Sequence, residues 1–408
     1  MMMMQDDRLA TLKLEKSGTA HFSVNSLFCF AGLALAITLV PAGCGGGSSS
    51  CTSCNNKTTP QVATPAITTT AAQNNALIVA MNDSTSGATI YYTIDGSTPT
   101  SSSIQYLAPF LVASNETVNA IGIASGDTNS TVATQAFSPN IASGTLVWSD
   151  EFANSGSSNV LPSASNWTYD TGYQCCGNNE QETYCAAGSS TSPCDSNNPN
   201  AYIAPGGGLN IVAQQPSNGM YTSARLKSEG LFSFQYGRIE ASIKVPEEQA
   251  MWPAFWMLGN SIATINWPAC GEADIMEHID GANTPYGGPG TGSAPGFDWY
   301  QASVHGTGLN GGTPWPTSSA TSYSATAWHK YGMIWTKGQI QYYIDDPSNI
   351  VESAFTTTNP GQGTWPFDQG PMFIILNLAV GGSWPGNVDS TTVFPQTMQV
   401  QYVRIYTN

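Results

Sequence analysis

A strict alternation of apolar and polar side chains is the feature that most constrains the fold of this chain. In residues 237–245, apolar side chains at the odd positions 239 to 245 alternate with Arg238, Glu240, Ser242 and Lys244. A period of two is the pattern of a half-buried antiparallel strand. Residues 331–335 and 339–344 flank a turn at 336–338 and predict a hairpin. Because no long amphipathic helix pattern occurs, we predict an all-β, two-sheet jelly roll for residues 144–408.

Length and charge limit the classes of protein to consider. A chain of 408 residues predicts two domains rather than one. Charged residues make up 9% of the chain, and the net charge of −16 reflects its 11 Lys and Arg residues rather than many acids. This balance argues against nucleic acid or an anionic membrane surface as partner, whereas a neutral polysaccharide remains compatible.

The N-terminus has the features of an export signal, which we place at residues 1–43. Three basic residues precede an apolar run at 27–40 that is too short to cross a bilayer comfortably. Cys44 and the Gly/Ser tract after it resemble a bacterial lipoprotein signal, in which the cysteine is lipidated, although Pro41 departs from the usual pattern. We predict an exported protein, either lipid-anchored through Cys44 at the bacterial cell envelope or secreted. Residues 44–59 would form a flexible linker.

Nine cysteines fit an oxidising compartment. Cys29 would be removed with the signal, and we interpret Cys51 and Cys54 as a small disulfide loop. The cluster of Cys175, Cys176, Cys185 and Cys194 predicts a stapled loop, with three connectivities open. A zinc site is disfavoured because two adjacent cysteines are poorly spaced for tetrahedral ligation.

Residues 60–139 predict a separate small β-sandwich. Strand-like runs at 76–81, 89–94 and 117–123 are separated by turn residues. Residues 90–100 resemble the fibronectin-like module at the C-terminal end of chitobiases. The resemblance implies no chemistry, and we favour a spacer over a sugar-binding module.

Three carboxylates cluster within six residues, at Glu272, Asp274 and Glu277. On a regular strand Glu277 would face away from the other two, so a one-residue bulge near Ile275 and Met276 is needed to return it. Mutual repulsion would then raise the proton affinity of at least one acid and keep a general acid protonated beside an ionised nucleophile.

This spacing resembles the Glu-x-Asp-x-x-Glu signature of family 16 glycoside hydrolases, in the bulged form of laminarinases. Matching segments occur in the family's order across 144–408, at residues 146–152, 177–180, 223–226, 236–240, 252–259 and 376–386. The resemblance implies a concanavalin A-like jelly roll, with Glu272 as nucleophile, Glu277 as acid/base and Asp274 as modulator. It further implies retention of anomeric configuration, with carboxyl groups about 5–5.5 Å apart.

A polysaccharide cleft also needs apolar platforms and polar anchors. Trp252 and Trp256 share a face of one predicted strand, and with Trp384 they are the candidate platforms. The resemblance adds four residues that would bind sugar hydroxyls, namely Asn178, Glu180, Arg225 and His305. We expect His278 to be structural.

Two departures from the family affect details. Cys175-Cys176-Gly177 replaces the usual Trp between glycines, so a substrate-binding loop is expected to be reshaped. Gln401 stands where relatives often place an Asp that binds a structural calcium. Losing a charged ligand would weaken that calcium site, so we do not expect calcium to bind there strongly. We also expect no cofactor and no catalytic metal.

The leading hypothesis is an endo-acting, monomeric hydrolase of β-1,3-glucan or mixed-linkage β-glucan. An agarase, a carrageenase or a transglycosylase could share the fold and the acids. A non-catalytic lectin could share the fold, but it would not need both Glu272 and Glu277.

Overall fold

The computed structural model describes residues 59–216, 219–246, 248–279, 299–315, 323–355 and 365–408. The predicted signal peptide, Cys44 and nearly all of the predicted linker therefore lie outside the described residues. No helix in these ranges is long and apolar enough to cross a membrane.

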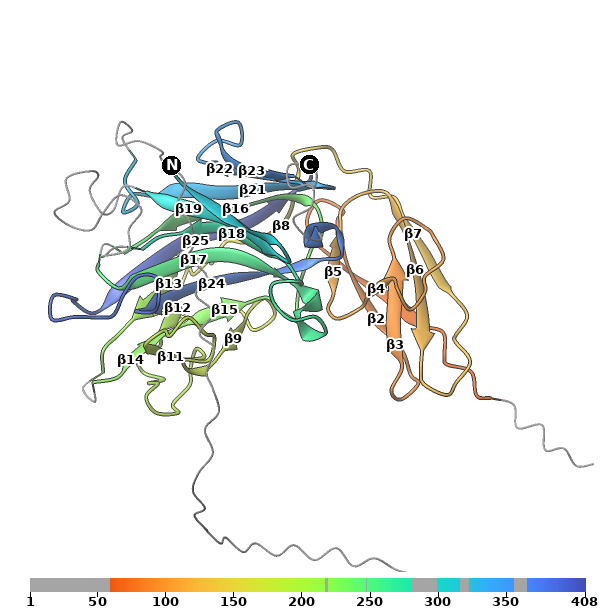
Figure 1. Cartoon of the computed structure of the whole chain (residues 1–408), viewed down its shortest axis with the longest axis horizontal. Coiled ribbons are helices and arrows are strands. Elements are labelled where there is room, and N and C mark those ends of the chain that lie inside the picture. The colour runs from red at the N-terminus through yellow and green to blue at the C-terminus, as the bar shows by residue number, and fades with distance from the viewer. Residues whose placement is uncertain (1–58, 217–218, 247, 280–298, 316–322, 356–364) are drawn as a thin grey trace, which may run out of the picture. The chain divides into compact units, whose positions relative to one another are not determined.

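Two large antiparallel sheets form the C-terminal domain (Figure 1). The first sheet has the order β12-β13-β25-β16-β21-β22-β23, with β8 also paired to β25. Its strands are β8 (Leu146–Asp150), β12 (Ala201–Ile203), β13 (Leu209–Ala213), β16 (Gly237–Lys244), β21 (His329–Thr336), β22 (Gln339–Ile344), β23 (Ile350–Phe355) and β25 (Gln396–Tyr406).

The second large sheet has the order β20-β19-β18-β17-β24-β15-β9. Its strands are β9 (Thr168–Asp170), β15 (Arg225–Lys227), β17 (Met251–Gly259), β18 (Glu272–Glu277), β19 (Tyr300–Gly306), β20 (Leu309–Trp315) and β24 (Met372–Val380). A three-stranded sheet joins β10 (Gly172–Tyr173), β11 (Glu182–Tyr184) and β14 (Tyr221–Ser223). The helices of the described chain are two 3-10 turns, η1 (Asn260–Ala263) and η2 (Pro366–Asp368).

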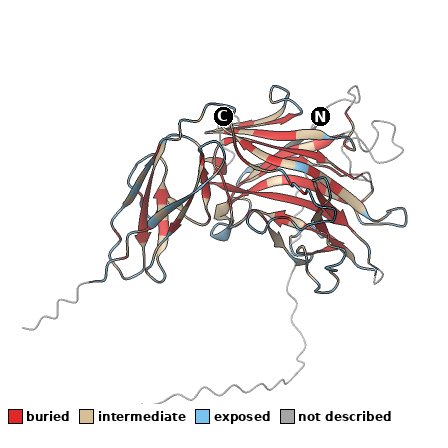
Figure 2. Cartoon of the chain, turned by 180° about the vertical axis from the view of Figure 1, so that it is seen from behind, coloured by how far each residue is buried: buried red, intermediate tan, exposed pale blue. Residues whose placement is uncertain are grey.

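The core lies between the two large sheets. Ile239 and Met333 from the first sheet belong to the same buried cluster as Phe255 and Leu376 from the second. Figure 2 shows buried residues concentrated along these strands. The predicted alternating strand is β16, the predicted hairpin is β21–β22, and the all-β jelly-roll prediction is confirmed.

The N-terminal domain is a small sandwich with its own core. One sheet has the order β1-β2-β5 and the other β4-β3-β6-β7. Their strands are β1 (Ala66–Ala71), β2 (Leu77–Asn82), β3 (Thr89–Thr93), β4 (Ile104–Gln105), β5 (Phe110–Val112), β6 (Glu116–Ile123) and β7 (Ala133–Phe137). Val79, Tyr92 and Val118 are buried between the sheets. The three predicted strand runs correspond to β2, β3 and β6.

Backbone hydrogen bonds join the two domains, which fall in one compact unit, Thr58–Asn408. Ser233 bonds through its carbonyl oxygen to the Leu111 amide and through its own amide to the Pro109 carbonyl, both at 3.0 Å. The Gln73 amide donates to the Val147 carbonyl at 3.1 Å.

Candidate active site

A β-bulge in β18 places the three acids on one face of the second sheet. Across β17, Phe255 pairs with Met276 and Trp256 pairs with Asp274, so Ile275 is the extra residue. Across β19, Asp274 pairs with Ser303 and Glu277 with Gln301, so three steps along β18 match two on its partner. The bulge prediction is confirmed. Ile275 and Met276 are buried in the core, whereas Glu272, Asp274 and Glu277 share the opposite face.

Each of the three carboxylates has a defined hydrogen-bond donor or close basic neighbour. The indole nitrogen of Trp267 donates to Glu272 Oε2 at 2.8 Å, and that of Trp252 donates to Glu277 Oε1 at 3.0 Å. The Ser303 hydroxyl lies between two acids, 2.8 Å from Asp274 Oδ2 and 3.3 Å from Glu277 Oε2.

His305 completes the carboxylate cluster. Its Nε2 atom lies 3.1 Å from Asp274 Oδ2 and 4.0 Å from Glu272 Oε1. The family resemblance implies that His305 binds sugar hydroxyls, and in the structure its ring also lies against the central acid. A protonated His305 would favour the ionised form of Glu272, as the nucleophile role requires.

Burial and mutual charge raise the proton affinity of both glutamates. Burial raises the pKa of Glu277 well above its usual range, the charge of Asp274 adds to this, and the Trp252 hydrogen bond opposes it. Burial and then Asp274 also raise the pKa of Glu272, while His305 and the Trp267 hydrogen bond oppose the rise. Glu272 is thus the more stabilised anion, and Glu277 is the better proton reservoir.

The candidate platforms surround these acids. Trp252 and Trp256 project from β17 on the carboxylate face and are partly buried. Trp384 packs edge-to-face on Trp252, with ring centroids 5.4 Å apart. Arg225 lies over the Trp256 ring at 4.6 Å, and its Nε atom lies 2.9 Å from Asp170 Oδ2. The Arg225 guanidinium is therefore engaged with protein groups rather than isolated.

The segment with Asn178 and Glu180 lies beside the Trp384 loop. The Ser383 amide donates to the Asn178 carbonyl at 2.7 Å, and the Asn179 side-chain amide donates to Ser383 Oγ at 2.8 Å. Glu180 is only 3% exposed and accepts a hydrogen bond from the Asn178 side chain at 3.4 Å. Asn178 is therefore the better placed of the two to meet a sugar hydroxyl.

His278 is buried as a structural residue would be. Its Nδ1 atom lies 2.8 Å from the Trp299 carbonyl oxygen, and burial lowers its pKa to about 4. Sequence reasoning missed Trp267, Ser303 and also Asn377, whose Oδ1 atom accepts a hydrogen bond from the Trp256 indole at 2.8 Å, as members of the site. Trp267 lies five residues before Glu272 and is 55% exposed, so its position just before the acids was the available signal.

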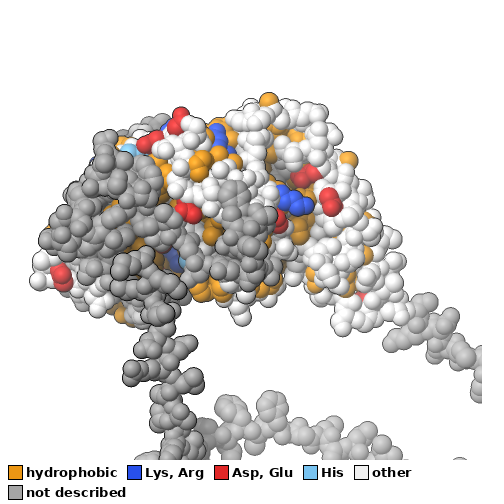
Figure 3. Space-filling view, turned by 45° about the horizontal axis from the view of Figure 1, so that its top comes forward, with side chains coloured by type: hydrophobic (Ala, Val, Ile, Leu, Met, Phe, Trp, Pro, Cys, Tyr) orange, Lys and Arg blue, Asp and Glu red, His pale blue; other side chains and the backbone are white. Residues whose placement is uncertain are grey.

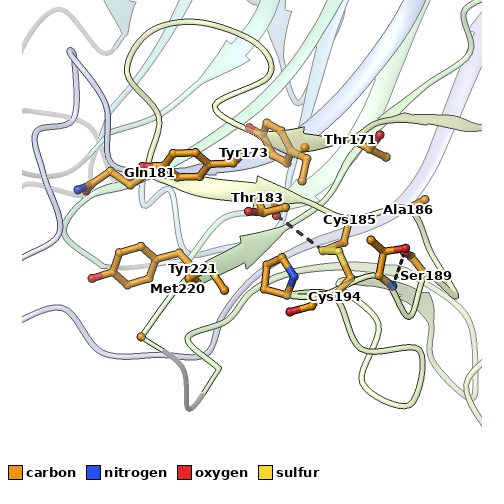
Figure 4. Close-up of a pocket in the computed structure, with 16 residues that line it drawn as sticks. Thr171, Tyr173, Gln181, Thr183, Cys185, Ala186, Ser189, Cys194, Met220 and Tyr221 are labelled. Atoms are coloured by element: carbon orange, nitrogen blue, oxygen red, sulfur yellow. Dashed lines mark hydrogen bonds between the residues drawn. A yellow bond between two sulfur atoms is a disulfide. The ribbon is translucent and has the colours of Figure 1, made fainter.

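The cysteine cluster forms two disulfides, Cys185–Cys194 and the adjacent pair Cys175–Cys176. Cys185–Cys194 closes a loop that lines a pocket of about 850 Å³ with Gln181, Thr183 and Tyr221 (Figure 4). The pocket lining contains no charged side chain. Of these two bonds, Cys185–Cys194 closes the stapled loop that the cluster predicts, whereas Cys175–Cys176 joins two residues that are adjacent in sequence.

Glu272, Asp274 and His305 also offer donor atoms within 4.8 Å of one another, close enough to hold a metal ion. In the described residues this cluster coincides with the carboxylate site itself. We therefore assign these side chains to the chemistry of the carboxylates. Gln401, at the position considered for calcium, accepts a hydrogen bond from the Ser242 hydroxyl at 2.7 Å.

A jelly roll with paired glutamates among tryptophans defines a class of enzyme, the glycosidases that act through two carboxylates. The profile described as glycosyl hydrolases family 16 matches residues 189–404, and the profile described as Fn3 associated matches residues 79–137. The chain belongs to glycosyl hydrolase family 16, and it is a glycoside hydrolase.

Individual relatives agree with this assignment. A β-glucanase of Rhodothermus marinus is 36% identical over 272 residues, which cover 64% of this chain and 84% of that protein. The catalytic domain of an endo-1,3-β-glucanase (laminarinase) from Thermotoga petrophila has a TM-score of 0.53 at 30% identity, covering 66% of this chain and 99% of that one. A keratan-sulfate endo-1,4-β-galactosidase of Sphingobacterium multivorum is 35% identical over 199 residues, covering 48% of this chain and 42% of that protein.

Proposed function

We propose that this protein is an endo-acting, retaining hydrolase of β-1,3-glucan or mixed-linkage β-glucan. The observation that carries the proposal is the bulge at Ile275, which brings Glu277 onto the face of Glu272 and Asp274. Relatives that act on β-glucan and share this domain support the choice of substrate.

The arrangement supports a double displacement. Glu277 would protonate the glycosidic oxygen while Glu272 attacks the anomeric carbon and forms a glycosyl-enzyme. Glu277, then ionised, would take a proton from water, and the water would release the sugar with retained configuration. Asp274 raises the proton affinity of Glu277 before the first step and is held in place by Ser303 and His305.

A neutral substrate fits the charge of this face. Arg225 and Lys227 stand on β15, and both are ion-paired with Asp170, at 2.9 and 2.7 Å. The segments outside the described ranges of the second domain contain no Lys or Arg. Figure 3 shows charged side chains to be sparse on the face in view. A sulfated glycan would call for cations that are not already neutralised by the protein.

The keratan-sulfate relative makes a sulfated or galactose-based polymer the second candidate, together with agarose and carrageenan. A transglycosylase would form the same glycosyl-enzyme and pass it to a sugar instead of water. A lectin is disfavoured because it would not need both Glu272 and Glu277 on one face.

Parallel digestion of laminarin, lichenan, agarose, carrageenan and keratan sulfate tests the proposal. We expect oligosaccharides from laminarin, with lichenan cut where it contains β-1,3 bonds. Release of products only from a galactose-based polymer would refute the glucan assignment. With a defined glucan oligosaccharide as substrate, products longer than that oligosaccharide would indicate transglycosylation.

We also propose that the enzyme is exported and attached to the cell envelope through a lipid on Cys44. The sequence around Cys44 is the support for this part of the proposal. The mature protein should partition into detergent, and Cys44→Ser should abolish that behaviour. A water-soluble mature protein whose N-terminus is not residue 44 would contradict it.

A further inference from the structure

Two buried glutamates lie in the segment that also carries Asn178. Glu180 is 3% exposed and Glu182, at the start of β11, is 1% exposed. Their neighbours in sequence, Gln181 and Thr183, line the pocket on the other side of this segment (Figure 4). Glu182 has no role in the chemistry described above.

The buried oxygens of this pair lack a hydrogen-bond donor. Glu180 and Glu182 lie close enough for the charge of Glu180 to raise the pKa of Glu182, and two neighbouring carboxylates have no hydrogen to donate to each other. Glu180 Oε2 and Glu182 Oε1 are buried and receive no N–H or O–H donor within the described part of the chain. One proton held between the carboxyl groups would satisfy both oxygens.

Glu182 is the better holder of that proton. Burial raises the pKa of Glu182 well above its usual range, and the charge of Glu180 raises it further. The Val380 amide donates to Glu182 Oε2 at 2.8 Å, which leaves Oε1 to carry the proton. Glu180 Oε1 in turn accepts a hydrogen bond from the Asn178 side chain.

The pair is linked to the substrate platform through neutral side chains. The phenol of Tyr184 lies beside both carboxyl groups and accepts a hydrogen bond from the Asn377 amide at 3.2 Å. Asn377 Oδ1 accepts from the Trp256 indole at 2.8 Å. The charged group that faces this cluster from β15 is Arg225, whose own partner is Asp170 on β9.

We propose that Glu182 is a positioning residue that stays protonated and donates a hydrogen bond to Glu180. This bond fixes Glu180 and Asn178 on one side and the Tyr184–Asn377–Trp256 chain on the other, so that both meet a sugar unit in one geometry. The inference rests on the proposed function for its effect on glucan binding. The proton itself can be tested without any substrate.

The first test compares the pH dependence of unfolding in urea for wild type and Glu182→Gln. The folded pKa of Glu182 lies above the unfolded value, so its contribution is present at low pH and is lost as pH rises through the folded pKa. Glutamine keeps an N–H donor but does not titrate. The ratio of variant to wild-type unfolding constants should therefore fall by up to tenfold per pH unit above about pH 4.5.

Two further variants keep this test decisive. Glu180→Gln removes the charge that raises the pKa of Glu182 further and supplies a donor from the other side, so it should reduce the same pH dependence, even if Glu182→Gln fails to fold. Glu352→Gln, a partly exposed residue on β23, is the matched control and should follow wild type. Wild-type pH dependence in both Glu182→Gln and Glu180→Gln would overturn the proposal.

The second test is kinetic. For wild type, KM on laminarin should rise at alkaline pH as Glu182 loses its proton, and Glu182→Gln should lack that rise. Glu182→Leu, which has no donor, should raise KM several-fold at every pH. Equal KM profiles in wild type and Glu182→Gln would refute the positioning role. If the stability result holds and no variant or wild type cleaves glucan, the proposed function fails and the shared proton remains.

Discussion

Replacing Trp267 by Phe tests how far one hydrogen bond favours the ionised form of the nucleophile. The Trp267 indole donates to Glu272 Oε2 at 2.8 Å, and a hydrogen bond to a charged group contributes about 1.5–3 kcal/mol. Because Trp267 is 55% exposed, solvent replaces part of that energy, and we take about 1.4 kcal/mol, which is one pKa unit. Removing the donor disfavours the carboxylate, so the pKa of Glu272 should rise.

The assay is the pH profile of kcat/KM on soluble laminarin. Activity requires ionised Glu272, so the acid limb of Trp267→Phe should move about one unit to higher pH, with roughly tenfold lower activity below it. Trp328→Phe, another exposed tryptophan at 42%, is the control and should keep the wild-type limb. An acid limb that stays in place in Trp267→Phe would refute the assignment of this hydrogen bond to the nucleophile.

Three other predictions concern Asp274, the Cys185–Cys194 disulfide and the N-terminal domain. Asp274→Asn removes the charge that raises the pKa of both glutamates, so the alkaline limb of the kcat profile should move to lower pH. The variant should lose less activity than Glu272→Ala or Glu277→Ala. An alkaline limb that does not move would argue against an effect of Asp274 on the pKa of Glu277. Cys185→Ser with Cys194→Ser opens a loop with a sequence separation of 9, and urea unfolding should show a loss of about 2.5 kcal/mol, whereas unchanged stability would mean that the bond does not form. A protein truncated to residues 140–408 should cleave soluble glucan at near full rate. It should lose about 3 kcal/mol of stability because the truncation removes three inter-domain backbone hydrogen bonds. A folded but inactive product would show that the N-terminal domain completes the site.

The strands and the carboxylate face could be predicted from sequence because successive side chains of a strand point to opposite faces of the sheet. Alternation marks β16, and the odd step from Asp274 to Glu277 already requires a bulge. Such patterns depend only on neighbours in the chain.

The hydrogen-bond partners of the acids depend on which strands lie side by side. The alternation of side chains within one strand does not supply that information. Ser303 reaches Asp274 and Glu277 only because β19 pairs with β18, and Asn377 reaches Trp256 only because β24 pairs with β17. The burial of Glu182 likewise depends on the contact of its segment with Val380 on β24. For the same reason the contact of His305 with Asp274 could not be predicted.

The configuration of azide products distinguishes Glu272 as the nucleophile from Glu277 as the acid/base. With an activated aryl β-glycoside of a β-1,3-linked glucose oligomer, Glu272→Ala should give the α-glycosyl azide, since azide occupies the space of the missing nucleophile. Glu277→Ala keeps the covalent route and should give the β-glycosyl azide. The opposite pair of products would reverse the two roles and contradict the account.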